Sequence, residues 1–174
     1  MNYSFDPKIH HNSKRINIIV ACGHNRVIGK NGKLPWSIKE DWDYFMNTTC
    51  GGSMIMGRTC YREFEPFAKE REVIGLTRNQ SYNFPNAITA NSLRQALSLA
   101  TKKSVWICGG ERLYEEAMSI SERLYITLID SQFKGDVFFP PWENTFNRLL
   151  SKKEVDTKQG NLKFLVYDKF QQKI

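Results

Sequence analysis

Asp41 is an acidic residue placed where a carboxylate could bind a ligand. It lies in 37-SIKEDWDYFMNTT-49, where Ser37 followed by Glu40 predicts a capping box with Ser37 as the helix N-cap. With about 100° of rotation per residue, mostly apolar side chains form a stripe along one side of this helix, made of Ile38, Trp42, Phe45, Met46 and Thr49. Asp41 falls at the edge of that stripe, whereas Glu40 and Asp43 fall on the far side.

The position of Asp41 allows a structural and a functional interpretation. An acid in the first turn of a helix favours the helix dipole, but Glu40 already fills that role. A carboxylate beside an apolar wall is costly unless a cation or several N–H donors meet it. Asp41 is therefore a candidate for binding a cationic or amidine-like ligand.

Turns rich in glycine and arginine follow three apolar runs and could bind phosphate. They are 57-GRT-59, Arg78-Asn79 and 109-GGERLY-114. In a parallel sheet these turns gather at the carboxyl edge, where open α/β sheets bind ligands. A helix that begins after Gly57 or Gly110 presents free backbone N–H groups to an anion. Arg58 and Arg78 add positive charge, so the pattern suits a dinucleotide.

The elements that must position these residues alternate between strand and helix. Near-continuous apolar runs predict buried strands at 16–22, 53–56, 73–77, 105–108 and 124–129. Helical patterns cover 37–49, a segment starting near Arg58, 93–100 and 112–118. The turn 158-KQGN-161 separates two further runs near the end of the chain. The pattern predicts a single-domain α/β fold with a mostly parallel central sheet, helices on both faces and a C-terminal antiparallel hairpin.

The 174 residues suit one domain, which we expect to span residues 16–174. Residues 1–15 are polar and show no periodicity, and we expect them to form a flexible arm in which His10-His11 is incidental rather than a metal site. The net charge of +7 invites a nucleic-acid interpretation, but the basic residues are scattered among acids. We therefore expect no nucleic-acid partner, although the charge steers anionic small ligands toward the protein.

Cysteine usage and hydropathy indicate a cytoplasmic protein without metal. The cysteines lie far apart, with no CxxC pair and no histidine at ligand spacing: Cys22, Cys50, Cys60 and Cys108. Free thiols in a reducing compartment are the expected state. No apolar run approaches the ~20 residues that a membrane span needs, and the N-terminus lacks the apolar region of a signal peptide.

Several enzyme classes are disfavoured by missing motifs. The chain has no G-x-G-x-x-G fingerprint and no Walker A lysine, which argues against a conventional Rossmann site and a P-loop NTPase. No nucleophile elbow is visible, and His24 stands alone in its loop, which argues against a hydrolase.

Short motifs in order along the chain resemble those of the dihydrofolate reductases. They are Ile19-Val20-Ala21, Asn25-Arg26-Val27-Ile28-Gly29, Leu34-Pro35-Trp36, Asp41, Phe45, Met56-Gly57-Arg58-Thr59, Thr77-Arg78, Gly109-Gly110-x-x-x-Tyr114 and Tyr125-Ile126-Thr127. The match runs from about Ile16 to Pro140 with spacings that need no forced gaps. The resemblance implies a monomeric enzyme that uses NADPH to reduce dihydrofolate to tetrahydrofolate, by hydride transfer to C6 and protonation at N5, and that binds antifolate inhibitors.

The resemblance also implies roles for a catalytic set, Asp41, Trp36, Thr127 and Tyr114. Asp41 would accept the pterin 2-amino group and N3–H as a bidentate pair and favour protonation of N5 through water. Trp36 would help to hold that water, Thr127 would support Asp41 by a hydrogen bond, and Tyr114 would lie near the nicotinamide. The loop Gly23 to Leu34 would close over the site and exclude water.

Binding roles carry over from the same resemblance. The pterin and aminobenzoyl groove would be lined by Ile19, Ala21, Phe45, Phe64 and Cys108. Arg71 would clamp the glutamate α-carboxylate of the substrate. Cofactor contacts would come from Ala21, Ile28, Gly29, Gly57, Arg58, Thr59, Thr77, Arg78, Gly110, Glu111, Arg112, Leu113 and Tyr114. Among these, Arg58, Thr77 and Arg78 would meet the 2′-phosphate and favour NADPH over NADH.

The chain also departs from the family pattern. It reads 66-PFAKER-71 where a proline-rich segment is common, which puts the loop shape and the role of Ala68 in doubt. Cys60 replaces a common threonine, Cys108 an aliphatic residue and Glu111 a glycine. The alternatives are an NADPH-dependent pyrimidine reductase of riboflavin synthesis, against which Asp41 argues, a non-catalytic binder of folate or dinucleotide, and an RNA-binding protein that uses the basic surface.

Overall fold

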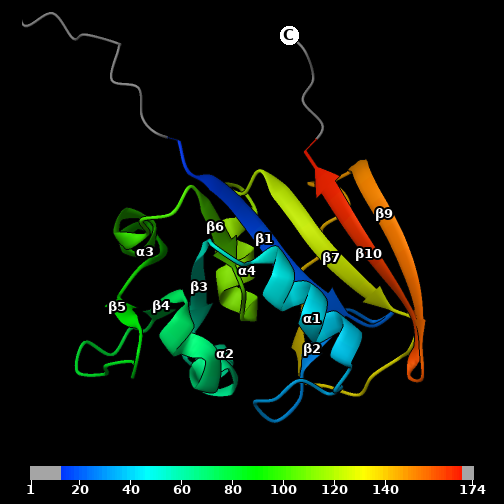
Figure 1. Cartoon of the computed structure of the whole chain (residues 1–174), viewed down its shortest axis with the longest axis horizontal. Coiled ribbons are helices and arrows are strands. Elements are labelled where there is room, and N and C mark those ends of the chain that lie inside the picture. Colours follow the sequence, from blue (N-terminus) through cyan, green and yellow to red (C-terminus); the bar gives the residue numbers. More distant parts are fainter. Residues whose placement is uncertain (1–12, 170–174) are drawn as a thin grey trace, which may run out of the picture.

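The fold is built on one large twisted sheet (Figure 1). The structure is a computed structural model that describes residues 13–169. Eight strands follow the order β5-β4-β3-β6-β1-β7-β10-β9. Their bounds are β1 Arg15–Cys22, β3 Ser53–Gly57, β4 Glu72–Leu76, β5 Ile88–Ala90, β6 Ser104–Ile107, β7 Arg123–Ile129, β9 Arg148–Thr157 and β10 Gly160–Asp168. A small antiparallel sheet pairs β2, Val27–Gly29, with β8, Val137–Phe138.

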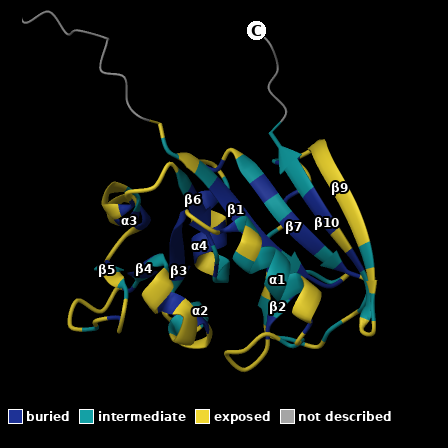
Figure 2. Cartoon of the chain, in the orientation of Figure 1, coloured by how far each residue is buried: buried dark blue, intermediate teal, exposed yellow. Residues whose placement is uncertain are grey.

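The strand directions confirm the predicted fold class. All pairings from β5 to β7 are parallel, and β10 runs antiparallel to both β7 and β9. The C-terminal hairpin turns at Gly160, whose φ of 123° lies in the region that favours glycine. The strand β9 lies at the edge of the sheet and is largely exposed (Figure 2). The predicted mostly parallel sheet and terminal hairpin are therefore both present.

Helices cover both faces of the sheet, as predicted. Their bounds are α1 Lys39–Thr48, α2 Arg58–Phe64, α3 Leu93–Leu99 and α4 Glu111–Ala117, and a 3-10 helix η1 covers Glu65–Glu70. Side chains of β3 point alternately to the two faces of the sheet and enter two separate cores. Ile55 packs in one core with residues of α3 and α4. Met54 and Met56 pack in the other core with Tyr61 and Phe64 of α2. Each strand side chain thus meets a helix on its own face.

The predicted capping box of α1 is wrong. The helix begins at Lys39, and its N-cap is Ile38, whose carbonyl accepts the Trp42 N–H at 3.1 Å. Ser37 lies one residue outside and makes no capping hydrogen bond, while its carbonyl accepts from the Gln159 side chain at 3.3 Å. Because helix starts depend on backbone dihedrals as well as residue type, a matching S-x-x-E pattern can fall one position early.

The first strand includes one residue of the predicted N-terminal arm. Arg15, which we assigned to the arm, opens β1 opposite Ser104 of β6. Its backbone N–H donates to the carbonyl of Lys103 at 2.8 Å. Most of the predicted arm, including His10-His11, lies outside the described residues. Within residues 13–169, no helix has the length and apolar character needed to cross a membrane.

Candidate active site

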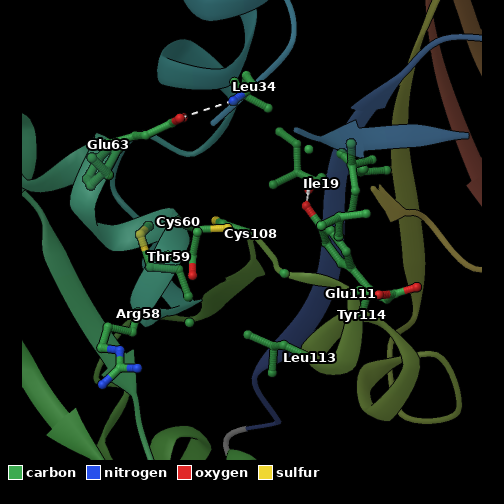
Figure 3. A pocket seen from close by; sticks show the side chains of 18 of the residues that line it. Ile19, Leu34, Arg58, Thr59, Cys60, Glu63, Cys108, Glu111, Leu113 and Tyr114 are labelled. Atoms are coloured by element: carbon green, nitrogen blue, oxygen red, sulfur yellow. Dashed lines mark hydrogen bonds between the residues drawn. The ribbon is translucent and has the colours of Figure 1, made fainter. Parts of the chain in front are cut away.

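A cleft of about 770 Å³ opens at the carboxyl ends of the parallel strands (Figure 3). It lies where α1, α2 and the start of α4 meet the ends of β1, β3 and β6. The structure brings together all predicted site residues except Trp36 and Arg71. Those lining the cleft are Ile19, Ala21, Ile28, Gly29, Asp41, Phe45, Gly57, Arg58, Thr59, Phe64, Thr77, Arg78, Cys108, Gly110, Glu111, Arg112, Leu113, Tyr114 and Thr127.

Asp41 lies on the side of α1 that borders the cleft. No residue of α1 is fully buried, because its apolar stripe forms part of the cleft wall rather than of a closed core. Burial of the Asp41 carboxyl raises its pKa from 3.8 to about 6, and polar interactions with Trp36 and Thr127 oppose that rise. The carboxylate therefore keeps acceptor capacity for a ligand with paired N–H donors.

Trp36 is not among the residues that line the cleft. Its ring packs against Phe133 with centroids 4.9 Å apart. Its indole Nε1 is buried and lowers the pKa of Asp41, but it makes no hydrogen bond of normal geometry to any residue between 13 and 169. A buried N–H without a partner is uncommon in folded proteins, and an ordered water is one way to satisfy it.

Two buried hydroxyl residues fix the floor of the cleft. Thr127 lies in β7 opposite Ala21 of β1. The hydroxyl of Tyr114, on α4, donates to the carbonyl of Ile19 at 2.8 Å. Burial raises the pKa of Tyr114 well above its usual value, so this phenol stays neutral and keeps its proton.

Aromatic rings form the wall of the cleft between α1 and α2. Trp42 packs against Phe45, Phe64 and Phe67 with ring centroids 5.6, 6.3 and 4.9 Å apart. Phe67 on η1 remains 43% exposed. Such a wall suits a flat apolar ligand group. Phe67, from 66-PFAKER-71, is not among the lining residues but supports the wall by packing on Trp42.

Arg71 lies outside the cleft lining and binds the end of α1. Its Nη2 donates to the carbonyl of Met46 at 2.8 Å, and its Nη1 donates to Thr49 Oγ1 at 3.1 Å. A cation at this end favours the helix dipole. These contacts fix the guanidinium beside α1, and its predicted role as a clamp for a carboxylate stays a prediction.

The half of the cleft at the starts of α2 and α4 has the hydrogen-bond donors and the cations that a dinucleotide needs. A Cβ added at Gly110 would meet nothing within 4 Å, so the backbone at the start of α4 is open to a ligand. Gly57, at the start of α2, donates its N–H to the carbonyl of Gly109 at 2.8 Å. Basic and hydroxyl side chains border the same region, namely Arg58, Arg78, Arg112, Thr59 and Thr77. This donor set fits a phosphorylated dinucleotide, although Glu111 adds one negative charge.

Two cysteines that replace common family residues also line the cleft. Burial raises the pKa of the Cys60 thiol to about 11 and that of Cys108 well above its usual value. Both therefore remain neutral thiols near pH 7 and are weak nucleophiles. Within the described residues the four cysteines are free, and no cluster of three or more His, Cys, Asp or Glu side chains could hold a metal.

Several residues of the site were not predicted from the sequence. The guanidinium carbon of Arg58 lies 5.3 Å from the centre of the Tyr82 ring. Glu63 on α2 accepts the backbone N–H of Leu34 at 3.0 Å (Figure 3). Trp42 also belongs to the cleft lining but was assigned only to the apolar stripe of its helix. No periodicity or spacing could have found the contacts of Tyr82 or Glu63, because they join separate segments of the chain.

The fold and the cleft define an α/β protein with a site for a phosphorylated dinucleotide at the carboxyl edge of a parallel sheet and an acid, Asp41, beside an aromatic wall. The family profile described as Dihydrofolate reductase matches residues 15–169, and the chain belongs to this family. The resemblance predicted from the motifs is thereby confirmed.

Relatives and a solved structure agree with this assignment. The dihydrofolate reductase of Staphylococcus haemolyticus is 39% identical over 127 residues, covering 72% of this chain and 76% of that protein. That of Bacillus subtilis is 31% identical over 158 residues, covering 88% and 94%. The structure of the Enterococcus faecalis dihydrofolate reductase, complexed with NADP(H) and RAB-propyl, has a TM-score of 0.80 at 24% identity and covers 90% of this chain and 97% of that one. This last likeness shows the same fold.

Proposed function

We propose that the protein catalyses the NADPH-dependent reduction of 7,8-dihydrofolate to 5,6,7,8-tetrahydrofolate. Membership of the dihydrofolate reductase family supports this reaction. The single observation that carries the assignment is Asp41, a half-buried carboxylate between an aromatic wall and a dinucleotide-sized half-cleft. A protein that merely bound a dinucleotide would have no need of this acid.

Asp41 binds the pterin in this proposal. Its two oxygens accept the 2-amino group and N3–H as a bidentate pair, which is stronger than neutral hydrogen bonds. The carboxyl is mainly ionised near pH 7, because its pKa of about 6 lies below that pH. Ile19, Ala21, Phe45, Phe64 and Cys108 enclose the flat rings. Arg71, which is held at the end of α1, binds the glutamate α-carboxylate in this proposal.

The cofactor half of the site orients the second substrate. Arg58, Arg78 and Thr77 hold the 2′-phosphate, and the first turns of α2, after Gly57, and of α4, after Gly110, hold the pyrophosphate. NADPH supplies the hydride when it is bound. Ala21, Ile28, Gly29, Leu113 and Tyr114 line the part of the cleft that lies toward β1 and the start of α4.

The proton that the reaction takes up goes to N5 of the pterin. The Trp36 indole N–H, buried and without a protein partner, can hold a water beside the Asp41 carboxylate. Negative charge on Asp41 favours protonation of the nearby ring nitrogen. The loop 23–34 shields this half of the site from bulk water.

The test is NADPH oxidation with purified protein and dihydrofolate, followed by near-ultraviolet absorbance, alongside Asp41→Asn. We expect substrate-dependent oxidation in the parent and a loss of at least about 100-fold at pH 7 in the variant, with NADPH binding retained. Turnover of dihydrofolate by the variant at the parental rate would refute the role of Asp41. No oxidation by either protein, in a folded sample that binds NADPH, would favour the pyrimidine reductase or the non-catalytic binder.

The proposal extends to the location, the oligomeric state and the inhibitors of the protein. We propose a cytoplasmic monomer whose cleft also accepts antifolates that mimic the pterin donors. A complete cleft within one chain supports the monomer. Light scattering of the purified protein would test it.

A further inference from the structure

We propose that Cys60 and Cys108 together form a dithiol site in the cleft for a trivalent aryl arsenical, which bridges the two sulfurs and places its ring on the aromatic wall. The site goes beyond the proposed reaction, because neither thiol takes part in hydride or proton transfer. Binding at this site can be measured without turnover.

The two thiols come from different elements and lie on one wall of the cleft. Cys60 lies on α2, and Cys108 directly follows β6. Both line the cleft, and both pack against the same hydrophobic cluster, which includes Phe64. Figure 3 shows both side chains, with their sulfur atoms in yellow, on this wall of the cleft.

Backbone hydrogen bonds hold the end of β6 against the start of α2. The N–H of Cys108 donates to the carbonyl of Ile55 at 2.9 Å, and the N–H of Gly57 donates to the carbonyl of Gly109 at 2.8 Å. A Cβ added at Gly109, the residue after Cys108, would lie 3.0 Å from Cys60 Sγ. The sulfur of Cys60 therefore lies against the backbone segment that carries Cys108.

The other two cysteines are not placed to join this pair. Cys22 packs in the core on the opposite face of the sheet and does not line the cleft. Cys50 is exposed in the turn after α1. By contrast, the charge of Cys60 is the cause, second only to burial, that raises the pKa of the Cys108 thiol. Because Coulomb interactions weaken with distance, this coupling agrees with two sulfurs that lie close to each other.

The surroundings of the two thiols favour a ligand whose adduct is neutral. Burial penalises the charged form of each thiol, so both sulfurs keep their protons near pH 7. Two thiolates on a monovalent soft cation would leave a negative charge in the cleft. Structural zinc takes four protein ligands, but no cluster of three or more His, Cys, Asp or Glu side chains lies between residues 13 and 169. Arsenic that carries one aryl group needs two sulfurs only and gives a neutral adduct.

The exchange at arsenic needs no oxidant. In hydrated phenylarsine oxide, arsenic carries a phenyl group and two hydroxyl groups. Each thiol sulfur forms a bond to arsenic, its S–H bond breaks, and the proton leaves with one hydroxyl group as water. Arsenic stays trivalent, and both sulfurs keep their oxidation state. The phenyl group stays on arsenic and meets the rings of Trp42, Phe45 and Phe64, which belong to the same cluster as the two thiols.

Titration of the purified, ligand-free protein with phenylarsine oxide tests the site. Mass spectrometry of the intact adduct gives the stoichiometry, and a count of free thiols in denaturant shows how many are blocked. We expect one arsenical per chain and the loss of two of the four thiols. An adduct that blocks one thiol only, or one that peptide mapping places on Cys22 or Cys50, would overturn the proposal.

Three variants identify the two sulfurs. Cys60→Thr and Cys108→Ile each introduce a residue type that is common at that position in the family pattern, so both keep the fold. Each should bind phenylarsine oxide at least about 100-fold more weakly than the parent, because the remaining thiol has no intramolecular partner. Cys50→Ser removes an exposed thiol as a matched control and should bind like the parent. Parental affinity in Cys60→Thr or Cys108→Ile would refute a bridge between the two thiols.

Two further measurements separate the bridge from the contact with the ring. Dithiothreitol should release the arsenical, whereas 2-mercaptoethanol at the same concentration of thiol groups should not; release by both reagents would contradict a two-sulfur bridge. Methylarsine oxide forms the same two bonds but has no ring. Relative to its affinity for dithiothreitol, it should bind the protein about three- to tenfold more weakly than phenylarsine oxide does. Equal relative affinities would overturn the placement of the ring on the aromatic wall.

Discussion

The hydroxyl of Tyr114 donates a 2.8 Å hydrogen bond to the carbonyl of Ile19, at the point where the sheet opens into the cleft. Strand β6 runs beside β1 as far as Ile18, which pairs with Ile107. Ile19 lies one residue beyond this last pair, and the donor comes from α4 instead of from a strand. The side chain that we predicted to lie near the nicotinamide thus also satisfies the backbone at the floor of the site.

Replacing Tyr114 by Phe should separate these two roles. The variant keeps the ring, which packs against Phe139 with centroids 5.0 Å apart, but leaves the Ile19 carbonyl without its donor. We expect a loss of about 1 kcal/mol in the free energy of unfolding and a rate of hydride transfer lower by up to about tenfold. Urea unfolding and single-turnover absorbance measure the two effects. A parental rate in a destabilised variant would mean that the hydroxyl serves the fold alone.

The main strands could be predicted from the sequence because each one is marked by an apolar run within its own segment. The apolar runs at 16–22, 53–56 and 124–129 are long enough to show burial on both faces, and each became a strand with bounds that differ by one residue at most. The small sheet of β2 and β8 was missed, because three and two residues are too few to show a period. The start of α1 was placed wrongly, because the capping pattern gave residue types and not the backbone geometry.

The cleft could be predicted only in part. Asp41 and the glycine turns after β3 and β6 were visible from helix geometry and topology, and the other lining residues that we predicted followed from the resemblance. Arg71, predicted to clamp a carboxylate, and Trp36, predicted to hold a water, are not among the lining residues; Arg71 binds the end of α1 and Trp36 packs on Phe133, and both roles stay predictions. Glu63 carried no signal in the sequence because its partner, the Leu34 N–H, is a backbone group 29 residues away. Contacts of this kind depend on the folded arrangement.

Asp41 should make the ligand-free protein less stable at neutral pH than at mildly acidic pH. Its pKa is about 6 in the folded protein against 3.8 ordinarily, so between these values the native state binds more protons than the unfolded state. The contribution of this residue to stability therefore falls as pH rises from about 4 to about 6, and above that it costs about 1–3 kcal/mol. Asp41→Asn should remove this cost.

Urea unfolding of the parent and of Asp41→Asn at several pH values measures this difference. We expect the variant to be more stable by about 1–3 kcal/mol at pH 7.5, with the gap shrinking as the pH approaches 4. Glu40→Gln, which changes an exposed acid in the same helical turn, is the matched control and should show no such trend. A stability difference between Asp41→Asn and the parent that stays constant with pH would contradict a raised pKa of Asp41. Together with the loss of turnover, a more stable variant would show that the acid is kept for function at a cost in stability.

Tyr82 should contribute to the preference for NADPH over NADH. Its ring lies 5.3 Å from the guanidinium carbon of Arg58, a residue proposed to meet the 2′-phosphate, and a cation held over a ring loses little freedom on binding. Because NADH lacks that phosphate, Tyr82→Leu should raise the KM for NADPH by about two- to fivefold and leave that for NADH unchanged. Tyr82→Phe keeps the ring and should behave like the parent. The ring also packs on Phe84, with centroids 4.9 Å apart, so an equal rise in both KM values would show that it only supports the fold.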